Sequence, residues 1–169
     1  MWDLPVRLLH WSLVLLVLAA SLTLVTPGLG TWHQAAGYGA LLVVLLRLVW
    51  GIAGSENARF SQFMRPPLAT WHYLRLLLQR REPLVLGHNP LGAWMIVALL
   101  STVAGLGLTG WLYTTDRFWG DETVEAWHGG LAWVLAGLVS GHLAGVLFTS
   151  LRQRENLVLA MWTGRKQRR

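Results

Sequence analysis

The sequence has no cysteine and few charged residues. Among its 169 residues only 13% are Asp, Glu, Lys or Arg, whereas 54% are hydrophobic. The lack of cysteine excludes disulfide bonds, Cys-ligated zinc, Cys-held iron–sulfur clusters and covalent haem attachment through a C-x-x-C-H motif. A soluble domain usually has about 25% charged residues. The low share of charged residues here, together with the mean hydropathy of +0.44, indicates a membrane protein. The length suits one domain, residues 1–169.

Four long apolar runs dominate the chain. They cover approximately residues 6–26, 33–52, 91–112 and 127–151. Each has about 20 residues, the length at which a helix crosses ~30 Å of hydrocarbon. The first run has a basic start like a signal peptide, but no small-residue cleavage pattern precedes Pro27, so a retained helix is expected. The fold class predicted is an all-α integral membrane protein with a four-transmembrane-helix bundle.

Charge placement predicts the topology. Basic residues gather between the second and third runs and in the tail: Arg59, Arg65, Arg75, Arg80, Arg81, Arg152, Arg154, Arg165, Lys166, Arg168 and Arg169. The two opposite loops carry one basic residue, Arg117, among four acidic ones. The positive-inside rule then places both termini and the middle loop in the cytoplasm. The pI of 11.1 reflects this orientation and contact with membrane lipid, so we expect no nucleic-acid partner.

The middle loop predicts a short extra helix. From Pro66 the sequence reads PPLATWHYLRLLLQRREP, with apolar residues at helical spacing and arginines toward the other side. This pattern is typical of an amphipathic helix on the cytoplasmic surface, and His72 is read as part of that interfacial helix. Further on, Asn89 followed by Pro90 predicts the N-cap and first residue of the third span.

Four histidines, His10, His33, His128 and His142, lie within the predicted spans. His128 and His142 are 14 residues apart, which is 40° short of four helical turns, so both rings share one face about 21 Å apart. His10 lies near the inner end of the first span, level with His142. His33 lies at the outer start of the second span, level with His128. The sequence therefore predicts two pairs, His10 with His142 and His33 with His128.

The chemistry of two separate imidazole pairs favours haem b. Zinc requires three or four clustered ligands, and a proton relay requires polar groups between the histidines; only Ser140 lies between His128 and His142. Haem b iron takes one histidine from each face, and its macrocycle fits between apolar helices of a bundle. Two bis-His haem b groups are the predicted cofactors. A haem-free channel or structural anchor is the alternative.

Two arginines are candidate partners of haem propionates. Arg7 lies one turn before His10, and either propionate contact or ordinary anchoring at the membrane surface explains it. Arg47 lies inside the second span, where a propionate is favoured over snorkelling to the surface. On the fourth span, Gly137, Gly141 and Gly145 recur every four residues, and close helix packing is the simpler interpretation of this ridge.

The order and spacing of several motifs resemble a known family. They are WDLPVRLLHW, WHQAAGYGALLVVLLRLVWG, GHNPLGAW and the histidine pair of the fourth span. Together they are similar to the bacterial cytochrome b561 family, which is related to the b-type cytochrome subunits of Ni/Fe-hydrogenase, formate dehydrogenase and thiosulfate reductase. The resemblance covers essentially the whole chain. It implies a four-helix core with two haem b groups, with His10, His33, His128 and His142 as the iron ligands.

The resemblance also implies a function. Family members exchange electrons with a membrane quinone, and His88 and Asn89 are candidate lining residues of a quinone pocket; capping of the third helix is the competing interpretation. We expect a dihaem cytochrome that transfers electrons between the quinone pool and a separate periplasmic partner, such as a cytochrome c or a dehydrogenase or hydrogenase subunit. It would be a carrier or subunit more than an enzyme. The alternative is a stand-alone quinone oxidoreductase using a small oxidant such as superoxide. A homodimer is left open.

Overall fold

The computed structural model describes residues 3–81 and 89–165 of the chain. Four helices in this part are long and apolar enough to cross a membrane: α1 (Leu4–Leu24), α2 (Gly30–Ala53), α5 (Pro90–Tyr113) and α6 (Glu122–Gln153). The described residues contain no strand. The predicted all-α, four-helix fold class is thereby confirmed, and each helix starts and ends within five residues of the predicted span.

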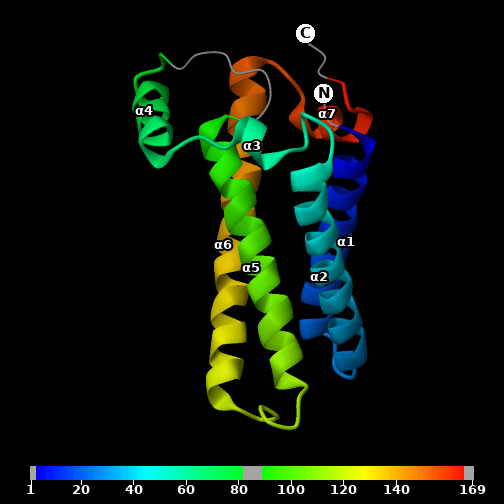
Figure 1. The fold of residues 1–169 in the computed structure, drawn as a ribbon. Helices are drawn as coiled ribbons and strands as arrows, with labels where there is room; N and C mark the ends of the chain where they lie inside the picture. Colours follow the sequence, from blue (N-terminus) through cyan, green and yellow to red (C-terminus); the bar gives the residue numbers. More distant parts are fainter. Residues whose placement is uncertain (1–2, 82–88, 166–169) are drawn as a thin grey trace.

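Three shorter helices lie at one end of the bundle. They are α3 (Phe60–Phe63), α4 (Pro67–Leu78) and α7 (Leu157–Thr163). Figure 1 shows them at the end where the chain also begins and finishes. Helix α4 coincides with the amphipathic segment predicted from Pro66, whereas α3 and α7 were not predicted.

Side-chain caps fix where three of the spans begin. The Asp3 carboxylate accepts from the Val6 N–H at 3.0 Å and caps α1. The Asn89 oxygen accepts from Gly92 N–H at 2.7 Å, which confirms Asn89 as the N-cap of α5. Asp121 caps α6, which therefore begins about one turn earlier than the hydropathy predicted. Charged residues in this first turn lower its hydropathy but satisfy the helix dipole.

The four long helices pack as two close pairs. Helix α1 packs along α2, α5 packs along α6, and α2 joins the pairs by packing on α5. The buried core lies at that junction and consists of Ala40, Val44, Leu100 and Val103. Small residues allow the approach, since a Cβ on Gly107 would lie 3.0 Å from Leu41. Helices α1 and α6 are not among the closely packed pairs.

Helix α6 has an unusual surface for a 32-residue helix. None of its residues is buried, although the helix contains a long, strongly apolar stretch. A Cβ on Gly137 or Gly145 would meet no atom within 4 Å, and one on Gly141 would meet only Met95. Close helix packing of this glycine ridge within the described chain was therefore the wrong interpretation. The exposed surface of α6 is available to contact lipid or a bound cofactor.

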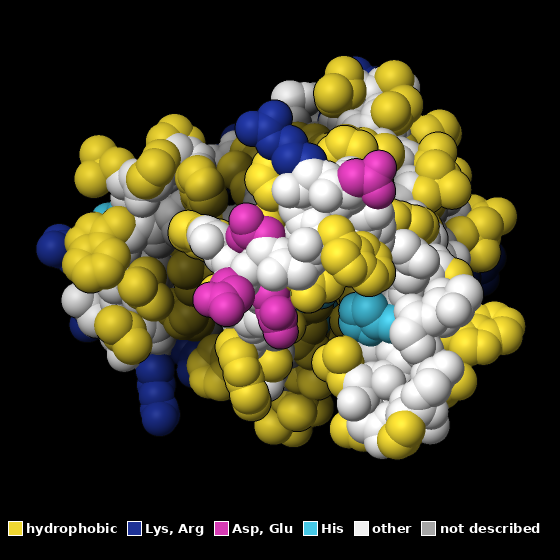
Figure 2. Space-filling model, turned by 90° about the horizontal axis from the view of Figure 1, so that it is seen from below, with side chains coloured by type: hydrophobic (Ala, Val, Ile, Leu, Met, Phe, Trp, Pro, Cys, Tyr) yellow, Lys and Arg dark blue, Asp and Glu magenta, His cyan; other side chains and the backbone are white. Residues whose placement is uncertain are grey.

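The two ends of the bundle differ in charge. Figure 2 looks onto the end opposite the chain termini, where acidic side chains gather and a histidine ring is visible at the surface. Exposed acidic residues of this end are Asp116, Glu122 and Glu125. The arginines of the loop between α2 and α5 lie at the other end. This asymmetry is the one expected of a membrane protein with one cytoplasmic face.

Candidate functional site

His33 and His128, the pair expected nearer the outer surface and named the outer pair for that reason, come from α2 and α6. His33 sits in the first turn of α2 and His128 in the second turn of α6. Their ring centres are 6.1 Å apart, and the ring planes are inclined by 72°. Both rings are partly buried. The predicted pairing of His33 with His128 is therefore present as a juxtaposition of two imidazoles.

The inner pair comes from α1 and α6. His10 and His142 have ring centres 6.4 Å apart with planes inclined by 58°. His10 also packs edge-on against Trp11 at 5.3 Å, and Trp11 packs in the same way on Trp162 of α7 at 5.6 Å. Helix α6 thus faces α2 at one depth and α1 at another, as the 14-residue spacing predicted.

Both separations suit a metal held between two imidazoles. An iron bound on opposite sides by imidazole nitrogens, at about 2.0 Å each, separates the ring centres by roughly 6 Å. Within residues 3–81 and 89–165 no group of three or more His, Asp or Glu could hold a metal, and each histidine pair offers two imidazoles. A Cβ on Gly37, Gly129 or Gly130, near the outer pair, would meet no atom within 4 Å. The donor set and the open backbone both fit bis-histidine haem.

Threonines orient the outer pair. His33 Nδ1 lies 3.0 Å from both the Ala20 carbonyl and Thr23 Oγ1. A carbonyl can only accept, so Nδ1 carries the proton and Nε2 keeps its lone pair. On α6, His128 Nδ1 lies 2.9 Å from Thr109 Oγ1, whose own hydroxyl donates to Gly105 O at 2.8 Å. The same reasoning leaves His128 Nε2 with a free lone pair.

The inner pair lacks such partners in the described part of the chain. Neither His10 nor His142 makes a hydrogen bond to residues 3–81 or 89–165, and the His10 ring contacts the rings of Trp11 and His142. A histidine ligand whose second nitrogen is hydrogen-bonded is more basic and better oriented. The two pairs therefore differ chemically, and a haem at each would experience a different ligand field.

Arg47 is buried beside the inner end of the bundle. Only 8% of its surface is exposed. Nη2 donates to the Ala58 carbonyl at 3.1 Å, and the guanidinium lies 4.8 Å above the Phe60 ring. Nη1 is buried without a hydrogen-bond partner among the described residues. A buried charged donor left unpaired is costly, so Nη1 of Arg47 can donate to one more anionic or carbonyl oxygen, as a propionate partner would require.

The remaining predicted site residues have other surroundings. Arg7 Nε donates to Met161 O at 3.2 Å, and its Nη2 contacts Trp162 O, so this side chain holds the last turn of α7. Asn89 uses its oxygen to cap α5. His88 lies outside the described residues. A haem role for Arg7 and a quinone role for His88 and Asn89 stay predictions.

Asp3 was missed by the sequence reasoning. Besides capping α1, its carboxylate accepts from Trp50 Nε1 at 2.9 Å and from Ser55 Oγ. Burial raises the pKa of Asp3, but the hydrogen bonds from Ser55, Trp50 and Val6 outweigh it and lower the pKa below its usual value. Asp3 thereby ties the start of α1 to the end of α2. An Asp directly before an apolar, Pro-containing helix start was the available signal.

The fold is that of a multi-pass membrane protein, and two facing histidine pairs lie within its helical bundle. Residues 1–164 match the family model described as prokaryotic cytochrome b561. The chain belongs to this family, whose b-type cytochromes carry haem b.

Relatives agree over nearly the whole length. Proteins from Bradyrhizobium diazoefficiens and Azotobacter vinelandii are 25% and 26% identical to this chain, covering 98% and 96% of it and 85% and 86% of their own lengths. Both are named "Probable Ni/Fe-hydrogenase B-type cytochrome subunit". The Escherichia coli K12 protein with the corresponding name for hydrogenase 1 is 21% identical over 96% of this chain and 88% of its own. No solved structure matched the chain significantly.

Proposed function

We propose that the chain is a dihaem b cytochrome that carries electrons across most of the bacterial inner membrane, between the quinone pool and a periplasmic redox partner. The observation that carries this proposal is the placement of two facing histidine pairs on one shared helix, with ring centres 6.1 and 6.4 Å apart. Their α6 members are 14 residues apart, about 21 Å along the axis.

Each pair would hold one haem through Nε2 of its two histidines. Bound haem supplies a centre that gains and loses one electron without any covalent change in the protein. The chain's own residues do the rest. Thr23 and Thr109 keep the Nδ1 protons of His33 and His128 in place. Arg47 offers a buried cation to an inner propionate. The apolar faces of α1, α2, α5 and α6 exclude water.

A quinone site near the inner pair would complete the path. His88 and Asn89 remain the candidate residues, at the start of α5. The Asn89 oxygen is used in the cap, which leaves its amide N–H groups to bind a quinone oxygen. The relatives named as hydrogenase cytochrome subunits support a hydrogenase subunit as the periplasmic partner. Its docking face would be the acidic outer end, near His33 and His128.

Electron transfer is tested with the purified, haem-loaded protein. A quinol analogue should reduce both haems, as followed by their visible absorption bands. Adding a Ni/Fe-hydrogenase, together with hydrogen, should reduce them without quinol, and a quinone should then reoxidise them. Asn89→Asp keeps the cap but removes the amide donor, and it should slow only the quinone-dependent step. Full quinol and quinone rates in that variant would remove Asn89 from the quinone site. Inertness of the wild-type protein toward every quinol would contradict the proposed function.

A further inference from the structure

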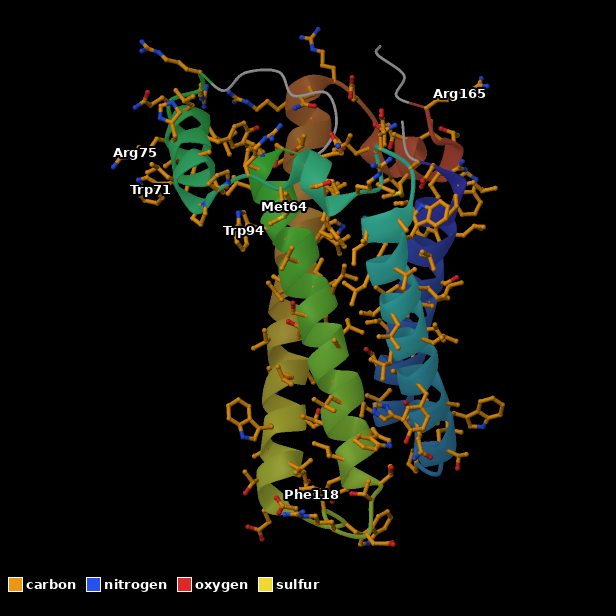
Figure 3. The ribbon with its side chains drawn as sticks, viewed as in Figure 1. Met64, Trp71, Arg75, Trp94, Phe118 and Arg165 are labelled. Atoms are coloured by element: carbon orange, nitrogen blue, oxygen red, sulfur yellow. The ribbon has the colours of Figure 1, made fainter. Side chains whose placement is uncertain are left out.

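An apolar groove lies between α4 and the start of α5. It has a volume of about 330 Å³ and is lined by Pro67, Thr70, Trp71, Leu74, Leu91 and Trp94. Figure 3 shows Trp71 and Arg75 on α4 and Trp94 on the neighbouring bundle helix. Trp94 Nε1 donates to the Arg65 carbonyl at 3.3 Å, so the groove is tied to the loop that leads into α4. Its walls offer almost no polar group.

The segment that carries α4 has charge of one sign. Residues 57–81 contain five basic residues and no acidic one: Arg59, Arg65, Arg75, Arg80 and Arg81. The Arg75 guanidinium lies 5.3 Å above the Trp71 ring, which places a fixed positive charge against one of the groove's lining residues. A cation stacked on an indole keeps its hydrogen-bond donors free at the ring's edges.

We propose that this groove is a binding site for an anionic phospholipid, with acyl chain against Trp71, Leu74 and Trp94 and phosphate at Arg75. The occupant must combine an apolar chain with a negative head, because the site combines an apolar wall with the Arg75 guanidinium stacked on Trp71. A neutral quinone would satisfy the wall and leave the charge unmatched. Basic segments at the end of a membrane helix attract anionic lipid in this way. The site is separate from the histidine pairs and does not depend on electron transfer.

Bound lipid would also explain how α4 is held. Within the described chain its long-range packing is against α5, and Leu68 and Leu78 are 80% and 77% exposed. Only Tyr73 of this helix is buried. An amphipathic helix so lightly packed gains its stability from the membrane surface. A lipid seated between α4 and α5 would bridge the two helices.

The test measures lipid retained by the full-length, haem-loaded protein after exposure to micelles containing equal phosphatidylglycerol and phosphatidylcholine, by native mass spectrometry. Wild type should retain phosphatidylglycerol selectively. Arg75→Gln should lower that retention about fivefold, the effect expected from one interfacial charge, and Arg75→Lys should largely restore it. Thr70→Phe, which fills the groove but keeps the charge, should also lower it.

The matched control is Arg117→Gln. Arg117 likewise stacks on an aromatic ring, Phe118, at 5.4 Å, but it lies at the other end of the molecule. That variant should retain lipid as wild type does. Equal lipid retention in Arg75→Gln and wild type, or an equal loss in Arg75→Gln and Arg117→Gln, would overturn the proposal. So would equal uptake of the two lipids, displacement by inorganic phosphate alone, or a quinone found in the groove in place of phospholipid.

Discussion

At the scale of single residues, the outer histidines are held by hydroxyl groups and the inner histidines by packing alone. Thr109 Oγ1 accepts a hydrogen bond from His128 Nδ1–H and donates its own hydroxyl to Gly105 O. Thr23 has the equivalent place beside His33, because it contacts both the ring and the Ala20 carbonyl. A hydrogen bond to the far nitrogen of a ligand histidine raises its basicity and stabilises the oxidised metal.

Replacing Thr109 by Val should therefore raise the reduction potential of the outer haem. The expected change is on the order of tens of millivolts, the equivalent of one hydrogen bond. Redox titration of the visible bands measures it. Thr102→Val is the control, since Thr102 lies on the same helix and its hydroxyl donates only to Ala98 O at 2.8 Å. Equal potentials in the two variants would show that Thr109 has no influence on the haem.

Arg47 gives a second prediction at this scale. Its unpartnered Nη1 is expected to pair with an inner propionate, so Arg47→Gln should lower the potential of the inner haem and weaken its retention. Arg59→Gln serves as control, because Arg59 also donates to a backbone carbonyl, Gly54 O at 2.9 Å, but is less buried. Haem content and redox titration are the measurements. An unchanged inner haem in Arg47→Gln would leave the buried arginine with a structural role only.

At the scale of elements, α6 supplies one histidine to each pair. The position of α1 depends on its N-cap, Asp3. The Asp3 carboxylate joins the first turn of α1 to Trp50, in the last turn of α2, and to Ser55, which follows that helix. This contact sets the position of α1 against α2, and so the height of His10 opposite His142. Because this N-cap also joins two helices, we expect it to stabilise the fold more than an ordinary N-cap does.

Asp3→Ala should reduce thermal stability by about 1–2 kcal/mol near neutral pH, the upper part of the usual N-cap range. The pKa of Asp3 is lowered in the folded protein. Its stabilising contribution is therefore present above the usual carboxyl range and is lost as the pH falls through the lowered pKa. Unfolding of wild type and variant should differ at pH 7 and converge in strong acid. Asp116→Ala, at an exposed loop position, should show no such difference.

The sequence predicts the long elements well and the contacts between them poorly. Hydropathy alone located all four spans, and capping chemistry located the start of α5 at Asn89. The sequence pattern did not predict the short helices α3 and α7, because four or seven residues are too few to show a helical period. The depth of each histidine followed from helix geometry. The partners Thr23 and Thr109 did not, because they depend on the rotation of one helix against another. The close packing predicted for Gly137, Gly141 and Gly145 of α6 failed for the same reason.

At the scale of the whole molecule, charge asymmetry and an even number of spans determine the expected orientation. Both ends of the described chain lie on one side of the bundle, with the arginine-rich loop. We predict that this side is cytoplasmic. Fusions of green fluorescent protein to the C-terminus should fluoresce, and alkaline phosphatase inserted after Arg117 should be active. Active phosphatase at the C-terminus would invert the topology and move the proposed quinone site to the periplasmic side.

Counting haems per chain tests the paired-histidine arrangement most directly. Pyridine haemochrome analysis of the purified wild type should give two haem b per chain. His142→Ala should remove the inner haem and His128→Ala the outer one, each leaving one haem with a distinct potential. His72→Ala, at an exposed position on α4, should keep both. Two haems retained in either ligand variant, or the same haem lost from both, would contradict the assignment of one haem to each pair.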